Sequence, residues 1–184
     1  MTALASVLIV PGLSNSGPEH WQSIWEARHP EYHRVQQEEW ETPRRSDWVR
    51  TLHAAIRNLG GPVVLAGHSS ACATIAQCAV EHGDCEGRVV AAFLVGPSDV
   101  EAATYPAGPT GFSPMPLQKL PFRSVVVAST DDPFVTLERA GLFSASWGSR
   151  LIKLPHAGHI NTASGHGPWP EGEAWLEELR KIPS

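Results

Sequence analysis

The stretch from Pro62 to Ala73 constrains the fold of this chain more than any other. It begins with an apolar run, passes through Gly67-His68-Ser69-Ser70-Ala71, and ends in small residues that pack closely in a helix. This order predicts a buried strand, a tight corner and a deeply packed helix over 70–82. A strand that leads directly into a helix is typical of a parallel sheet covered by helices.

The corner is one residue short of the G-x-S-x-G pattern of a nucleophile elbow. In an elbow the serine hydroxyl projects above the end of the sheet, and the residues two before and two after it must be small. Gly67 meets this requirement, and Ala71 exceeds it by one methyl group. The positive end of the following helix would face an oxyanion that forms on Ser69. The alternative is an ordinary Gly/Ser turn, which the pentapeptide alone does not exclude.

The rest of the chain alternates short apolar runs with helical patterns. Strands are expected at 5–10, 33–36, 62–66, 89–95, 124–128 and 150–154. Further helices are expected after a capping box at Ser16 and Glu19, after Ser46, and over 136–147 and 171–181. Because the apolar runs are short and do not alternate with polar residues, we expect a parallel sheet with helices on both faces.

Residues 1–184 are expected to form a single domain, since no repeat or linker interrupts the pattern. The segment 99–121 is rich in proline and glycine and has no helical periodicity. It is too short to form a helical cap domain over the sheet. The expected architecture is therefore a three-layer α/β sandwich without a cap.

The composition argues against several classes of partner. The net charge is −5 with no cluster of lysine and arginine, so nucleic acid is not expected to bind. No apolar run approaches the roughly 20 residues of a membrane span, and no basic region precedes the first strand as in a signal peptide. The three cysteines are an odd number in a chain without an export signal, which favours a reduced, cytoplasmic protein. The oligomeric state is not predicted.

Two cofactor hypotheses fail on local chemistry. Gly12 and Gly17 have the spacing of a phosphate-binding loop, but Pro18-Glu19 follow where lysine and serine or threonine are required. Three histidines between 156 and 166 could suggest zinc, yet no carboxylate or cysteine stands near them in the sequence. Neither a nucleotide nor a metal is expected.

Loops at the carboxyl ends of parallel strands meet at one edge of the sheet and build the site. Ser69 follows one strand, Asp131-Asp132 follow a later one, and His159 follows the last. This is the chain order of a serine–acid–histidine triad. A serine hydroxyl is a weak nucleophile until an imidazole takes its proton, and a carboxylate must hold that imidazole. We therefore expect catalysis at Ser69 with His159 and one of these aspartates, with Asp99 as the alternative acid.

An oxyanion formed on the substrate needs two backbone donors. The N–H of Ser70 is one, because it follows the nucleophile, and the N–H of Leu13 in the loop after the first strand is the expected second. Gly12 is expected to keep that loop tight beside the substrate. Three aromatic residues in loops are expected to line the pocket, namely Trp40, Phe112 and Trp169.

These motifs together resemble the small serine hydrolases of the retinoblastoma-binding-protein-9-like and YdeN-like family, within the α/β-hydrolase superfamily. The resemblance covers nearly the whole chain and rests on Val10-Pro11-Gly12, Glu19-His20-Trp21-Gln22, Trp40 with Thr42-Pro43, Gly67-His68-Ser69-Ser70, 129–135, 158–161 and 165–170. It implies a compact α/β-hydrolase without a cap. It also places the triad on Ser69, Asp132 and His159, because Asp132-Pro133-Phe134-Val135 matches the register in which the superfamily places its acid. Ala71 departs from the glycine that is usual in the family.

The sequence thus predicts a serine hydrolase that cleaves small carboxylic esters, or amides or peptides, through an acyl-enzyme on Ser69. No cofactor is required for this chemistry. The rival hypothesis is a non-catalytic module that binds a ligand or a protein on the same scaffold.

Overall fold

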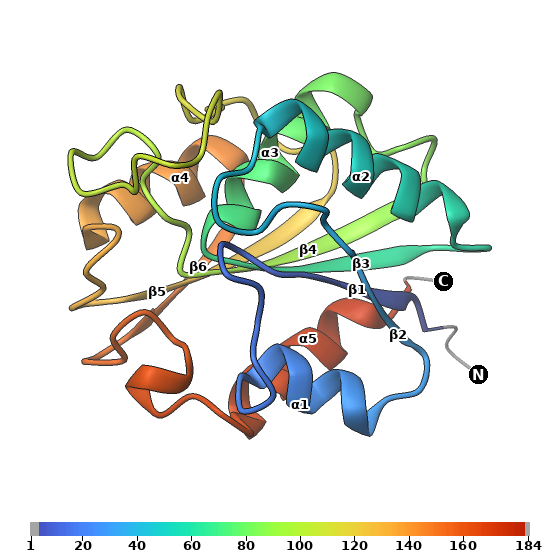
Figure 1. Cartoon of the computed structure of the whole chain (residues 1–184). Helices are drawn as coiled ribbons and strands as arrows, with labels where there is room; N and C mark the ends of the chain where they lie inside the picture. The colour runs from blue at the N-terminus through green and yellow to red at the C-terminus, as the bar shows by residue number, and fades with distance from the viewer. Residues whose placement is uncertain (1–3, 183–184) are drawn as a thin grey trace.

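The computed structural model describes residues 4–182 and contains one six-stranded sheet (Figure 1). All neighbouring strands are parallel, in the order β2-β1-β3-β4-β5-β6. The strands are β1 (Ser6–Val10), β2 (Tyr32–Arg34), β3 (Val63–His68), β4 (Val89–Val95), β5 (Arg123–Ser129) and β6 (Arg150–Leu154). The helices are α1 (Trp21–Arg28), α2 (Arg45–Asn58), α3 (Ser70–His82), α4 (Leu137–Trp147) and α5 (Pro170–Arg180), with a short 3-10 turn η1 (Thr162–Ser164).

Helices cover both faces of the sheet, as the sequence predicted. Figure 1 shows α2, α3 and α4 on one face and α1 and α5 on the other. Each face has its own apolar core, and β4 contributes to both: Leu94 packs into one core while Phe93 and Val95 pack into the other. Burial on both faces explains why the strands are continuously apolar. Within 99–122 the structure has no helix, in agreement with the expected absence of a cap.

Three local expectations differ from the structure. His20, rather than Ser16, caps α1, because its Nδ1 accepts the N–H of Gln22 at 3.2 Å. Ser16 donates instead to the Gln22 side chain at 2.5 Å. Helix α2 begins at Arg45, one residue before Ser46, and has no side-chain cap. Strand β2 ends at Arg34 instead of continuing to residue 36, since it is a short edge strand with one neighbour.

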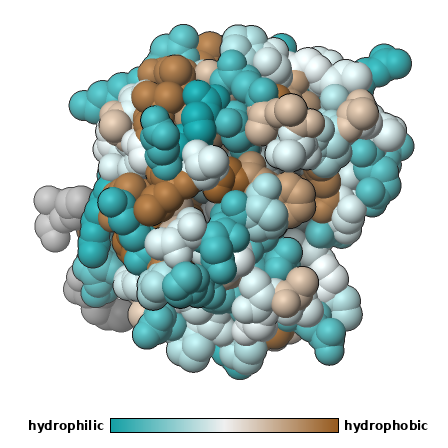
Figure 2. All heavy atoms as spheres, turned by 90° about the vertical axis from the view of Figure 1, so that its left-hand side faces the viewer, coloured by the Kyte–Doolittle hydropathy of each residue, from teal (hydrophilic) through white to brown (hydrophobic). Residues whose placement is uncertain are grey.

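Because all the strands run the same way, their carboxyl ends lie on one side of the molecule, at the left of Figure 1. Figure 2 looks onto this side and shows a band of hydrophobic surface between polar side chains. No helix within residues 4–182 is both long and apolar enough to cross a membrane. The carboxyl-end side is where the expected site residues gather.

Candidate active site

Ser69 occupies the corner between β3 and α3, with φ 60° and ψ −128°. A serine rarely adopts this backbone conformation, so the surrounding packing must hold it there. Gly67 packs closely on α3, because a Cβ at this position would lie 2.6 Å from Cδ1 of Ile75, and the end of that side chain would have to shift. Ala71 is fully buried, and its Cβ would lie 3.8 Å from such an atom on Gly67, an ordinary contact. The elbow therefore accommodates alanine where its pattern has glycine.

Asp132 and His159 form a buried pair at the ends of β5 and β6. Both carboxylate oxygens of Asp132 lie 2.9 Å from Nδ1 of His159, and the Asp132 side chain is completely shielded from solvent. The N–H of Phe134 donates to the same carboxylate at 2.9 Å, and the Phe134 ring stands against the imidazole at 4.6 Å. His68 Nε2 donates to the backbone oxygen of His159 at 2.8 Å, which ties the histidine loop to β3. The carboxylate thus fixes the proton of His159 on Nδ1 and leaves Nε2 as an acceptor.

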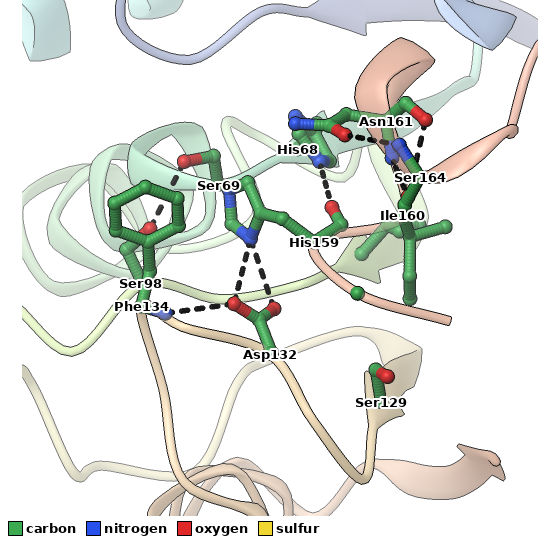
Figure 3. A network of polar contacts seen from close by, with 12 residues as sticks. His68, Ser69, Ser98, Ser129, Asp132, Phe134, His159, Ile160, Asn161 and Ser164 are labelled. Atoms are coloured by element: carbon green, nitrogen blue, oxygen red, sulfur yellow. Dashed lines mark hydrogen bonds and ion pairs between the residues drawn. The ribbon is translucent and has the colours of Figure 1, made fainter. Parts of the chain in front are cut away.

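Figure 3 shows the His159 ring between Asp132 and Ser69. The hydrogen bond that the structure gives to the Ser69 hydroxyl runs to Ser98 Oγ, at 2.9 Å. Ser98 follows β4, the strand beside β3, and is buried. Sequence reasoning considered only Asp99 at the end of this strand and missed Ser98. The signal available was its place, since every polar residue at the carboxyl end of a central strand is a candidate.

The loop after β1 packs directly on the elbow. A Cβ at Gly12 would lie 2.8 Å from the His68 oxygen and 2.9 Å from Cβ of Ser69. Only glycine permits this approach, which brings Leu13 and Ser70 to the same cavity as Ser69. Gly12 itself does not line the cavity, so its contribution is close packing rather than contact with a ligand.

The cavity has a volume of about 500 Å³. Its lining includes polar residues of the loop after β1 and of 161–162. The apolar lining residues are Leu13, Tyr105, Pro106, Phe134 and Ala163. Tyr105 also donates its hydroxyl to Ser70 Oγ at 3.0 Å, so the irregular segment 99–122 is fastened to the start of α3.

The three aromatic residues expected in the pocket lie elsewhere. Phe112 is 2% exposed and stands against Trp48 in the core. Trp169 stacks on Trp25 in the other core, on the face of the sheet that α1 and α5 cover. Trp40 packs against Trp48 and accepts a backbone hydrogen bond from the loop after β1. The position of a residue in a loop does not determine the direction of a large side chain. These three aromatic side chains pack into or against the apolar cores.

The alternative acids have other partners. Both oxygens of Asp99 bind the guanidinium group of Arg139, at 2.7 and 2.9 Å. Asp131 is exposed, and its carboxylate accepts the Ser129 hydroxyl at 2.7 Å and the N–H of Gly158 at 2.8 Å. Asp131 therefore braces the loop that carries His159, while Asp132 alone bonds the imidazole.

Two further histidines that line the cavity have lowered pKa values. Burial, with smaller contributions from Arg34 and neighbouring histidines, lowers the pKa of His20 from 6.5 to about 4. Burial also lowers the pKa of His68 well below its usual value. Among residues 4–182, no three histidine, cysteine, aspartate or glutamate side chains are grouped to hold a metal ion.

His20 makes the stability of the protein depend on pH. Between pH 6.5 and about 4, His20 is protonated in the unfolded chain but remains neutral in the folded protein. The free energy of unfolding therefore decreases as the pH falls through this range. The loss between pH 7 and pH 5 is about 2 kcal/mol. The variant His20→Asn keeps an oxygen to cap α1 but does not titrate. Urea unfolding followed by tryptophan fluorescence should therefore show a flatter pH dependence for the variant, and equal pH dependence would contradict this role.

Comparisons with known proteins show the family and the fold of the chain. A family model described as serine hydrolase matches residues 7–178. The structure is similar to that of a YdeN-like hydrolase from Pectobacterium atrosepticum, with 29% identity and a TM-score of 0.85, over 96% of this chain and 91% of that one. It is also similar to the ydeN gene product from B. subtilis, with 19% identity and a TM-score of 0.72, over 95% and 98%. Est1E from Butyrivibrio proteoclasticus shares the fold at 13% identity and a TM-score of 0.68, over 97% and 89%. No curated protein sequence matches the chain.

Proposed function

The chain belongs to the serine hydrolase family, and from this premise we propose that it cleaves small carboxylic esters through an acyl-enzyme on Ser69. The observation that carries the proposal is the placement of Ser69 on a strained elbow beside a histidine whose Nδ1 is bonded to a buried carboxylate. In a serine hydrolase, an imidazole held by a carboxylate turns a neutral hydroxyl into a nucleophile. Amide or peptide bonds are the second substrate class that the same chemistry serves.

The proposed reaction follows from the positions of these groups. Ser69 Oγ attacks the carbonyl carbon while Nε2 of His159 takes its proton, and Asp132 stabilises the resulting imidazolium. The N–H groups of Leu13 and Ser70 receive the negative charge that develops on the carbonyl oxygen. His159 then returns the proton to the leaving alcohol, and the acyl group stays on Ser69. A water molecule, deprotonated by His159, releases the acid and restores the hydroxyl.

Labelling with a fluorophosphonate probe tests the proposal against the non-catalytic alternative. The probe reacts with a serine only where the hydroxyl is activated, so a binding module that retains Ser69 would remain unlabelled. We expect one adduct, located on Ser69 by peptide mass spectrometry. An adduct on Ser70 or Cys72 would contradict the assignment of the nucleophile.

The cavity favours short acyl groups. Its volume is about 500 Å³, and the segment that could form a lid has no helix and contributes only Tyr105 and Pro106 as walls. We expect p-nitrophenyl acetate and butyrate to be cleaved faster than the palmitate, without activation by lipid micelles. Specific activities measured over a chain-length series check this, and a maximum at palmitate would overturn it.

A further inference from the structure

We propose that Ser98 is a positioning residue for the nucleophile: its hydroxyl donates to Ser69 Oγ and keeps the Ser69 proton available to His159. This inference rests on the proposed function. The observation behind it is the 2.9 Å separation of the two hydroxyl oxygens, with Ser98 only 3% exposed. Figure 3 shows the Ser69 and Ser98 side chains turned toward each other, beside His159.

The proposed role requires that Ser98 donate this hydrogen bond and that Ser69 accept it. Within residues 4–182, Ser69 Oγ is the one hydrogen-bond partner that the structure gives to Ser98 Oγ. If Ser69 were the donor, its proton would be held by Ser98 and would not be available to His159. His159 lines the same cavity as the half-buried Ser69 and is the acceptor that the proposed reaction requires for this proton. The proposal therefore assigns Ser98 as the donor.

The residues on either side of Ser98 hold it in place. Gly96, at φ +53°, donates its N–H to the Val127 oxygen at 2.9 Å. A Cβ on Gly96 would lie 3.3 Å from Asp132 Oδ2 and 3.4 Å from His159 Nδ1, so this glycine packs against the acid–base pair. On the other side, the N–H of Asp99 donates to the Phe134 oxygen at 3.0 Å. The segment 96–99 thus contacts Ser69 through Ser98 and packs against Asp132 and His159 at Gly96.

A donated hydrogen bond acts on Ser69 by restricting its side-chain rotation. A serine hydroxyl on a free Cβ samples several rotamers, and only one directs its proton at Nε2 of His159. Removing the Ser98 hydroxyl leaves the cavity and the Asp132–His159 pair unchanged but lets Ser69 rotate. The expected effect is a slower attack by Ser69 with unchanged binding of the reagent.

The experiment uses a p-nitrophenyl alkylphosphonate, whose reaction stops after a single step. Ser69 Oγ forms a bond to phosphorus, the bond to nitrophenolate breaks, and the serine proton moves to His159. We expect Ser98→Ala to lower the first-order rate constant about tenfold without changing the dissociation constant of the reagent. The variant Ser98→Thr, which retains a hydroxyl on Cβ, should react at close to the wild-type rate. The apparent pKa of the pH–rate profile should be the same in all variants, since Ser98 carries no charge.

A matched control is available at the opposite end of the sheet. Ser124 is also buried and forms a serine–serine hydrogen bond, to Ser149 Oγ at 2.6 Å. Ser124→Ala removes the same kind of bond far from the site and should leave the rate constant unchanged. Ser98→Cys keeps the side-chain shape with a weaker donor and should also react slowly, so the test does not depend on folding of the alanine variant.

The outcomes separate the two proposals. A labelled Ser69 whose rate is the same, or higher, in Ser98→Ala and Ser98→Cys overturns the role of Ser98 alone. A shifted pH–rate profile or a weakened dissociation constant with an unchanged rate constant does the same, because it would indicate a general distortion of the site. Wild-type protein that is not labelled at Ser69 overturns the proposed function and this inference with it.

Discussion

Replacing Ser69 by alanine is expected to lower ester turnover by a factor on the order of 10⁴ or more. The alanine variant keeps the elbow, the cavity and the Asp132–His159 pair but has no atom that can attack the carbonyl carbon. The remaining activity would come from the oxyanion donors and from substrate binding alone. Steady-state kinetics with p-nitrophenyl butyrate measures the loss.

Ser144→Ala is a suitable control for this substitution. Ser144 lies on α4, is 2% exposed and donates its hydroxyl to the Ser149 backbone oxygen at 3.0 Å. Ser144→Ala therefore removes a serine hydroxyl and its hydrogen bond without touching the site. Activity of Ser69→Ala within a hundredfold of wild type, with the control unaffected, would show that another group is the nucleophile.

The second large effect distinguishes two adjacent carboxylates. Asp132→Asn should approach the defect of Ser69→Ala, because an amide in place of the carboxylate lets His159 adopt the wrong tautomer, which costs about 10⁴ in turnover in serine proteases. Asp131→Asn should stay within roughly tenfold of wild type, or about 1.4 kcal/mol in barrier. An asparagine at 131 still presents an oxygen to the Gly158 N–H, the bond that braces the histidine loop.

Parallel assays of the two variants with thermal unfolding as a stability control check this ranking. The reverse order of the two defects would move the acid to Asp131. Asp99→Asn is a third comparison, since it weakens the ion pair with Arg139. A loss of 10⁴ in that variant at undiminished stability would assign the acid to Asp99.

The candidate triad could be proposed from the sequence because topology brings its members to one edge of the sheet. Once the short apolar runs are assigned to a parallel sheet, the residues after each strand must meet at that edge, and the chain order indicates Ser69, an aspartate at 131–132 and His159. The choice of Asp132 needed the family's register, and the structure supports it through burial and the bonds to His159.

The walls of the cavity could not be predicted in the same way. The large aromatic side chains of the loops pack into or against the nearest apolar core, as Trp40, Phe112 and Trp169 do. Tyr105 lines the cavity and donates its hydroxyl to Ser70, a contact between an irregular segment and the start of α3, 35 residues apart. Side-chain contacts of this kind depend on the packing of the whole fold, and no periodicity or motif in the sequence predicts them.

The strand order has a consequence for how activity is lost on heating. Ser69 stands at the centre of the sheet, whereas His159 follows β6, which is one of the two edge strands and is only partly buried. Outer strands open more readily than central ones, since fewer contacts must break. Fraying of β6 would carry the imidazole away from the serine while the core around β3 and β4 remains folded. Inactivation should therefore begin at temperatures below the cooperative melting of the protein, and residual activity reports on the integrity of one edge rather than of the whole molecule.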